Sequence, residues 1–127
     1  MYYNIKPVND INDCVQCFKG KTFFSLNLKL LKAYDKRMYA YFVEHTMTTE
    51  ERYIFKKALP KCFLKLWEAD IFGESVLDVK TCKKLMKFID MHVYERDFDV
   101  DCLYGALEWA VDKDVNICVK ASDTPFK

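Results

Sequence analysis

The chain has 127 residues, 51% of them hydrophobic and 16% aromatic, with a formal net charge of +1. This much apolar material excludes a disordered chain, and the length is close to that of a single domain. Three glycines and three prolines are too few for a many-turned β-sandwich or barrel, and the balanced charge argues against nucleic-acid binding. We therefore expect an all-α fold, a compact bundle of five to seven short helices forming one helical domain over residues 1–127.

The first predicted helix covers residues 7–18. Pro7 suits the first turn of a helix, and Gly20 suits the position just past its end. Between them the apolar residues repeat at helical spacing: Val8, Ile11, Val15 and Phe18.

A second apolar pattern predicts a helix over residues 25–44, with Ser25 as its N-cap. The pattern is also compatible with two shorter helices that are broken near residues 34–36. Further on, Thr48 and Glu51 have the spacing of a capping box, which predicts the start of another helix. Because proline disfavours a helical conformation in the residue before it, we expect a break at Leu59, before Pro60.

The last part of the chain carries the most regular helical patterns. An apolar face over residues 63–71 ends at Gly73, and Asp78 is placed to cap an amphipathic helix over residues 79–89. Residues 92–98 are predicted as a loop, after which Asp99 caps a helix over residues 100–111. Gly105 inside that helix suggests close approach of a neighbouring helix. Residues 115–119 alternate like a strand, but with no partner strand in sight we expect a packed extended tail.

The sequence contains no recognisable catalytic, cofactor or metal site. Cys14 and Cys17 have ligand-like spacing, but a structural zinc site needs four ligands. The other candidates are scattered singly: His45, Cys62, His92 and Cys118. Asp97, Asp99 and Asp101 alternate as in a calcium loop but lack its glycine and final glutamate. We therefore predict a protein that is not an enzyme and needs no cofactor.

Two features bear on partners. Lys80, Lys83, Lys84 and Lys87 form one side of the predicted helix over residues 79–89, which we interpret as a solvated face rather than a phosphate contact. The aromatic residues are too many to be central in a small core, so we expect most of them to lie half-buried at its edge; the alternative is that some form an exposed patch that docks a protein partner. These residues are Tyr2, Tyr3, Tyr39, Tyr41, Phe42, Tyr94 and Tyr104.

Three segments carry a resemblance to a known family. Residues 63–70 begin with Phe63, residues 79–89 form an amphipathic helix with a paired apolar end, and residues 102–111 read CLYGALEWAV with Trp109 near the end. In this pattern the C-terminal half resembles the BACK domain, the helical module that follows the BTB domain in BTB–kelch adaptor proteins. The chain departs from that family at residues 94–96, where the usual Leu-Asn-Val is replaced, and at Gly105.

The resemblance implies a non-enzymatic adaptor or scaffold, with a link to substrate presentation to cullin-type ubiquitin ligases. The alternative hypothesis is a virus-encoded helical regulator of host apoptosis or innate signalling, a Bcl-2-like bundle that binds a partner helix. The start of the chain lacks a signal peptide and no stretch is long enough to span a membrane, so we expect an intracellular protein, cytoplasmic or nuclear, with reduced cysteines. A homodimer remains open.

Overall fold

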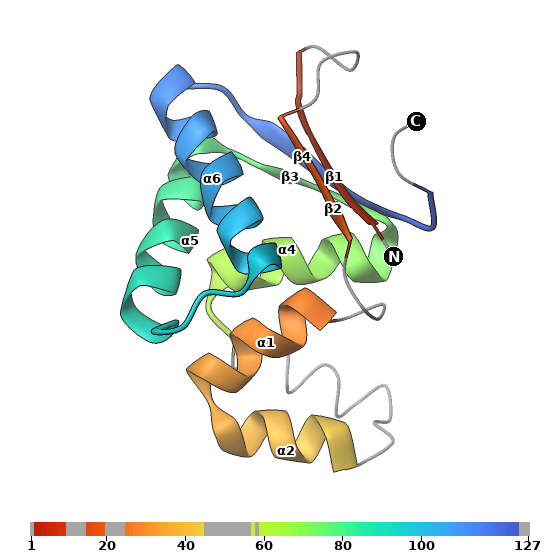
Figure 1. The fold of residues 1–127 in the computed structure, drawn as a ribbon, viewed down its shortest axis with the longest axis vertical. Coiled ribbons are helices and arrows are strands. Elements are labelled where there is room, and N and C mark those ends of the chain that lie inside the picture. The colour runs from red at the N-terminus through yellow and green to blue at the C-terminus, as the bar shows by residue number, and fades with distance from the viewer. Residues whose placement is uncertain (1, 10–14, 20–24, 45–56, 58, 125–127) are drawn as a thin grey trace.

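Residues from both ends of the chain form one antiparallel sheet in the computed structural model, which describes residues 2–9, 15–19, 25–44, 57 and 59–124 (Figure 1). The strand order is β2-β1-β4-β3. The strands are β1 (Tyr2–Pro7), β2 (Gln16–Lys19), β3 (Glu74–Leu77) and β4 (Ile117–Ser122). The two central strands, β1 and β4, therefore come from opposite ends of the described chain.

The sheet contradicts the predicted all-α bundle, and the fold is mixed α/β. The alternation after residue 115 does belong to a strand, since β4 pairs with β1 on one side and with β3 on the other. The predicted helix over residues 7–18 is also wrong, because Pro7 ends β1 and Gln16 begins β2. Residues 10–14 of that prediction lie outside the described residues. Pairing with β1 places Phe18 opposite Tyr3, and the two rings stack with centroids 5.3 Å apart.

The single helix predicted over residues 25–44 is divided in the structure, which agrees with the alternative of two shorter helices broken near residues 34–36. The structure has α1 (Ser25–Tyr34) and α2 (Lys36–Glu44), separated by Asp35. The Asp35 side chain accepts hydrogen bonds from the backbone N–H groups of Arg37 and Met38, at 3.0 and 3.1 Å, and so caps α2. The predicted capping box at residues 48–51 lies outside the described residues.

The remaining described helices are α4 (Lys61–Phe72), α5 (Val79–His92) and α6 (Phe98–Lys113). Two predicted boundaries are confirmed. Gly73 ends α4 in the left-handed conformation, with φ of 87°, and Asp78 caps α5 by accepting from the Thr81 N–H at 2.7 Å.

Two predictions about α6 are wrong. Asp97 occupies the N-cap position and Asp99 lies in the first turn, where its charge still suits the helix dipole. Gly105 is exposed, and a Cβ built on it meets nothing within 4 Å in the described part of the chain. The glycine therefore does not mark a close approach of helices.

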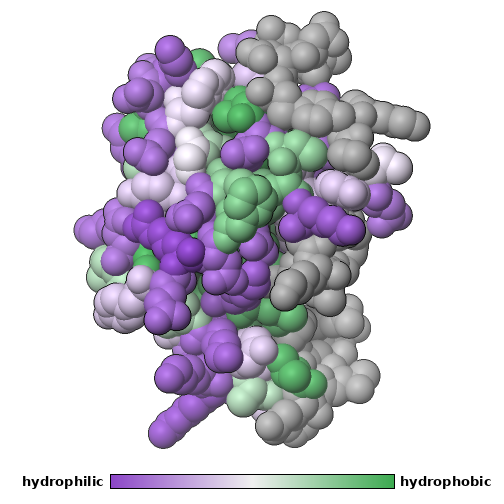
Figure 2. All heavy atoms as spheres, viewed as in Figure 1, coloured by the Kyte–Doolittle hydropathy of each residue, from purple (hydrophilic) through white to green (hydrophobic). Residues whose placement is uncertain are grey.

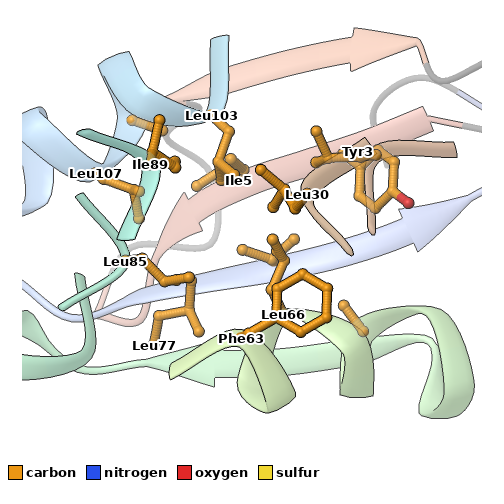
Figure 3. Packing of buried hydrophobic residues seen from close by; sticks show 14 of the residues in the cluster. Tyr3, Ile5, Leu30, Phe63, Leu66, Leu77, Leu85, Ile89, Leu103 and Leu107 are labelled. Carbon is orange, nitrogen blue, oxygen red and sulfur yellow. The ribbon is translucent and has the colours of Figure 1, made fainter. Parts of the chain in front are cut away.

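Helices cover one face of the sheet, and the opposite face carries both polar and apolar side chains, among them Asn4, Val76 and Lys120. In Figure 1, α4 crosses beneath the strands, α5 and α6 stand beside them, and α2 lies farthest from the sheet. Side chains on the covered face are fully buried, among them Ile5, Leu77 and Val119, whereas Lys120 on the opposite face is exposed. The core forms between these layers, where Figure 3 shows side chains converging from β1, α1, α4, α5 and α6: Ile5, Leu30, Leu66, Leu85 and Leu103.

Candidate functional site

A groove lies between α1 and the connection from α5 to α6. Its volume is about 380 Å³. One wall comes from α1 and the start of α2, and the other from residues 92–97 together with Val100 of α6. The side chains that give it chemical character are polar, charged or aromatic: Lys29, Lys32, Lys36, His92, Tyr94 and Asp97.

Aromatic packing fixes the base of the second wall. The His92 ring meets the Tyr34 ring edge-on at 5.3 Å and the Phe88 ring at 4.9 Å, measured between centroids. Phe88 in turn stacks on Phe63 of α4 at 5.7 Å. The end of α5 is therefore anchored to α1 and to the core, so the groove has a defined shape.

Lys29, which lines the groove, forms an ion pair that we name the α1–α6 salt bridge (Lys29, Asp97 and Asp99). The Lys29 Nζ atom lies 2.8 Å from a carboxylate oxygen of each aspartate. Partial burial lowers the pKa of Lys29, but the hydrogen bonds to Asp97 and Asp99 more than offset that effect, so the net pKa is raised. The lysine thus stays charged and ties the start of α6 to α1.

Three exposed apolar side chains either line the groove, as Tyr94 does, or adjoin a lining residue in the sequence, as Met91 and Phe98 do. Tyr94 is 90% exposed, and Phe98, which follows Asp97, is 74% exposed. Met91, next to His92, is 55% exposed. On the face shown in Figure 2, hydrophilic residues separate the hydrophobic patches, so these patches do not form one continuous apolar surface. We name the three exposed residues Met91, Tyr94 and Phe98, of which two are aromatic, the aromatic rim.

The connection between α5 and α6, which carries Tyr94, is held on its other side too. The Arg96 guanidinium lies 2.5 Å from an Asp90 carboxylate oxygen, and its carbon lies 4.1 Å from the centre of the Tyr104 ring. The Tyr104 hydroxyl donates to the other Asp90 oxygen at 3.1 Å. Residues 93–97 are therefore fastened to α5 and α6 as well as to α1.

A second polar cluster, the buried network (Tyr3, Asn27 and Asp70), lies in the core. The Tyr3 hydroxyl donates to Asp70 at 2.8 Å, and the Asn27 side-chain amide donates to the other Asp70 oxygen and to the Leu66 carbonyl. Burial raises the pKa of Asp70 to about 6, with the hydrogen bonds from Tyr3 and Asn27 offsetting only part of that effect. All members are at most 1% exposed, so no substrate reaches them and the network joins β1, α1 and α4.

The structure does not bring the predicted ligand-type residues together. Cys17 lies on β2 and Cys118 on β4, with β1 between them, and Cys62 lies on α4. Cys14 and His45 are outside the described residues. Among the residues that are described, no group of three or more His, Cys, Asp or Glu side chains is placed to hold a metal ion.

The aromatic residues singled out in the sequence separate into buried and exposed members. Tyr3 is fully buried, Tyr39 and Tyr104 are half-buried, and Tyr41 and Tyr94 are exposed. The sequence analysis missed the contribution of Phe98 and Met91, which lie in or next to helix patterns. Nothing in the sequence distinguished Asp70 from Glu68 on the same helix, because its partner Tyr3 lies far away in the chain.

The lysines of the amphipathic helix α5 are all exposed on its surface: Lys80, Lys83, Lys84 and Lys87. No described helix is long and apolar enough to cross a membrane. Comparison of the chain with protein-family models, with curated proteins and with solved structures finds no match. The functional argument therefore relies on the geometry of this chain.

Proposed function

We propose that this protein is a non-enzymatic protein–protein interaction module that binds its partner at the groove and the aromatic rim. The observation that carries the proposal is the exposure of Tyr94 and Phe98, at 90% and 74%, beside a groove of about 380 Å³. Large aromatic side chains supply much of the energy of protein interfaces when a partner removes them from water.

The fixed backbone behind the rim strengthens the proposal. Ordering a flexible loop opposes association, so a loop that is already ordered binds with a smaller entropy cost. Residues 93–97 are held by the α1–α6 salt bridge and by Arg96, which pairs with Asp90. The polar groups around the groove would then provide orientation, while Tyr94 and Phe98 provide most of the binding energy.

An adaptor role of the BACK type stays a prediction. Helices α4, α5 and α6 cover the three segments that resemble that family, but β3 lies between α4 and α5 and belongs to a sheet. The link to cullin-type ubiquitin ligases therefore rests on the sequence resemblance alone. The intracellular location likewise stays a prediction. The Bcl-2-like alternative called for a helical bundle, which the mixed fold does not supply, and we do not carry it further.

The test compares two sets of partners captured from cells by cross-linking and quantitative mass spectrometry. The Tyr94→Ala/Phe98→Ala double variant should lose its specific partners at least about tenfold, because each buried aromatic anchor contributes about 1–2 kcal/mol or more. The matched control is Phe72→Ala on α4, which removes a similarly exposed phenylalanine, 69% against 74%. Circular dichroism confirms that both variants fold.

Equal capture by the double variant and by the control would show that the aromatic rim is not the docking site. If no ubiquitin-ligase component is found among the partners that the double variant loses, the link to ubiquitin ligases is wrong. The proposal of an interaction module would still stand. A partner that still binds as a purified protein can then be titrated against the wild type and the double variant by calorimetry.

A further inference from the structure

The two walls of the groove carry charges of opposite sign. Among the described residues, the wall formed by α1 and the start of α2 contributes three lysines and no acidic side chain: Lys29, Lys32 and Lys36. The opposite wall contributes the carboxylates of Glu95 and Asp97 and the ring of His92, without a lysine or arginine in the described part of the chain. A segment that enters the groove therefore meets cations on one side and carboxylates on the other.

Lys29 is already neutralised within the chain. Its Nζ atom lies 2.8 Å from a carboxylate oxygen of Asp97 and equally close to one of Asp99. Because two carboxylates surround one ammonium group, the α1–α6 salt bridge offers no positive charge to a partner. The cations that remain for binding lie farther along the same wall.

Lys32 and Lys36 are these remaining cations. Both are exposed, and neither forms an ion pair within the residues that the structure describes. The carboxylate of Asp35, which lies between them in the sequence, is used to cap α2. The Lys32 Nζ atom lies 5.5 Å from the centre of the Tyr39 ring, a cation–π contact that places its ammonium group. This wall can thus receive a carboxylate from outside the chain.

Between the charged walls, the groove is lined by small and medium apolar side chains. Leu30 and Val100 are buried, Val93 is half-buried and Ala33 is exposed. The volume of about 380 Å³ is near the lower end of that of ligand sites in proteins. The groove therefore suits a few side chains of one partner segment, with an apolar side chain at its base.

We propose that the partner enters the groove through a segment that places a carboxylate against Lys32 and Lys36 and an adjacent apolar side chain on the base. This inference rests on the proposed function and adds the chemistry of the partner. Exposed Glu95 repels acidic groups from the opposite wall, so the segment binds with its acidic side toward α1 and α2. A nucleic-acid backbone fits less well, because two lysines are few for a row of phosphates and the second wall would repel them.

The test selects binding segments without assuming their sequence. Random peptides displayed on phage are selected on the full-length wild type, and the enriched peptides are synthesised and titrated by fluorescence anisotropy. Peptides whose binding is weakened by Tyr94→Ala/Phe98→Ala are assigned to the groove. We expect these peptides to carry aspartate or glutamate beside a large apolar residue.

The contribution of charge is then measured on one assigned peptide and on its analogue with the acidic residue replaced by the amide. The analogue should bind about fivefold more weakly, as two exposed ion pairs would give. Because such pairs are screened by salt, raising the salt from about 0.1 M to about 1 M should weaken the acidic peptide more than the analogue.

Matched variants locate the charge. Lys32→Gln/Lys36→Gln should bind the acidic peptide about fivefold more weakly and the amide analogue like the wild type. The control Lys80→Gln/Lys83→Gln removes the same charge from the exposed surface of α5 and should leave both peptides unaffected. Glu95→Gln should bind the acidic peptide at least as tightly as the wild type does.

Several results would overturn the inference. These are assigned peptides without carboxylates, equal binding of the acidic peptide and its analogue, an equal loss in the two lysine variants, or a selection that yields no peptide assigned to the groove. Failure of the proposed function is distinct from these results. If capture of partners from cells depends on Tyr94 and Phe98 but not on Lys32 and Lys36, the docking site stands and the partner has a different chemistry.

Discussion

Two polar clusters begin on the same helix, two residues apart, and behave in opposite ways. Asn27 of α1 belongs to the buried network, whose carboxyl group on Asp70 is 1% exposed. Lys29 of α1 belongs to the α1–α6 salt bridge, where the Asp97 side chain is 54% exposed. Both clusters fasten α1 to elements that are distant in the sequence. The difference in exposure determines how strongly each one depends on every partner being present.

In the buried network, no water is available to replace a partner that has been removed. At the α1–α6 salt bridge, water hydrates a charge that has lost its partner, so the ion pair contributes little net stability. We infer that the buried network specifies how α1, α4 and β1 meet, whereas the α1–α6 salt bridge positions the start of α6 and the loop that carries Tyr94. Three measurements test this difference, in order of the expected effect.

The largest effect is expected from Asp70→Ala. The Tyr3 hydroxyl and the Asn27 amide would lose their acceptor inside the core, and each such group costs about 1–3 kcal/mol when it is left unpaired. We expect the free energy of unfolding in urea to fall by about 3 kcal/mol. Asp112→Ala, at an exposed position of α6, is the control and should change it by less than about 0.5 kcal/mol. A loss as small as that of the control would mean that water reaches the network.

The next effect is a dependence of stability on pH. The pKa of Asp70 is raised from 3.8 to about 6 in the folded chain, so between these values the folded state keeps a proton that the unfolded state releases. Stability from this group is therefore complete below about pH 4 and is lost as the pH rises towards about 6, a fall of roughly 3 kcal/mol. The measurement is the unfolding free energy at several pH values for the wild type and for Asp70→Asn, which cannot titrate.

The difference between wild type and Asp70→Asn isolates this group from the other carboxyl groups. If that difference stays constant from pH 4 to pH 7, the carboxyl group titrates in its ordinary range and the argument from burial fails. If the unfolding free energy of the wild type falls relative to that of Asp70→Asn as the pH rises, the result agrees with the raised pKa of Asp70.

The smallest effect is expected from Lys29→Met. The methionine keeps most of the apolar stem, while the charge that pairs with Asp97 and Asp99 is lost. We expect a loss of about 1 kcal/mol in unfolding free energy, which shrinks at high salt because the pair is partly exposed. Lys29→Arg preserves the charge and should remain near the wild type. A loss as large as that of Asp70→Ala, or one that salt leaves unchanged, would erase the distinction between the two clusters.

Local signals predicted part of the helical structure. The glycine that ends α4 and the aspartate that caps α5 follow from contacts within a few residues, and both are confirmed. The break at Asp35 agrees with the alternative of two helices over residues 25–44. The loop between α5 and α6 is confirmed for the same reason. The candidate site was predicted only in part: Tyr94 was among the aromatic residues proposed for an exposed patch, but nothing local indicated that Lys29 would reach Asp97 and Asp99.

The sheet escaped prediction because its pairings are non-local. The segment after residue 115 alternates as a strand does, yet its neighbours β1 and β3 are far away in the chain, and β3 has only four residues. Helical spacing over residues 7–18 was misleading in the same way, because the burial of Phe18 comes from stacking on Tyr3 across the strands. Asp70 is a further case, since its ordinary acidic character gives no hint of a partner on β1.

The sequence by itself determined the end of α4, the start of α5 and that the chain has enough apolar residues for a core. Those properties depend on capping groups and on periodicity, which act over one or two turns. Only the tertiary structure decided that both ends of the chain pair in one sheet, that Asp70 is buried, and that Tyr94 and Phe98 stay exposed beside a groove. These outcomes depend on contacts between distant segments, and the environment of a side chain is set by what packs against it.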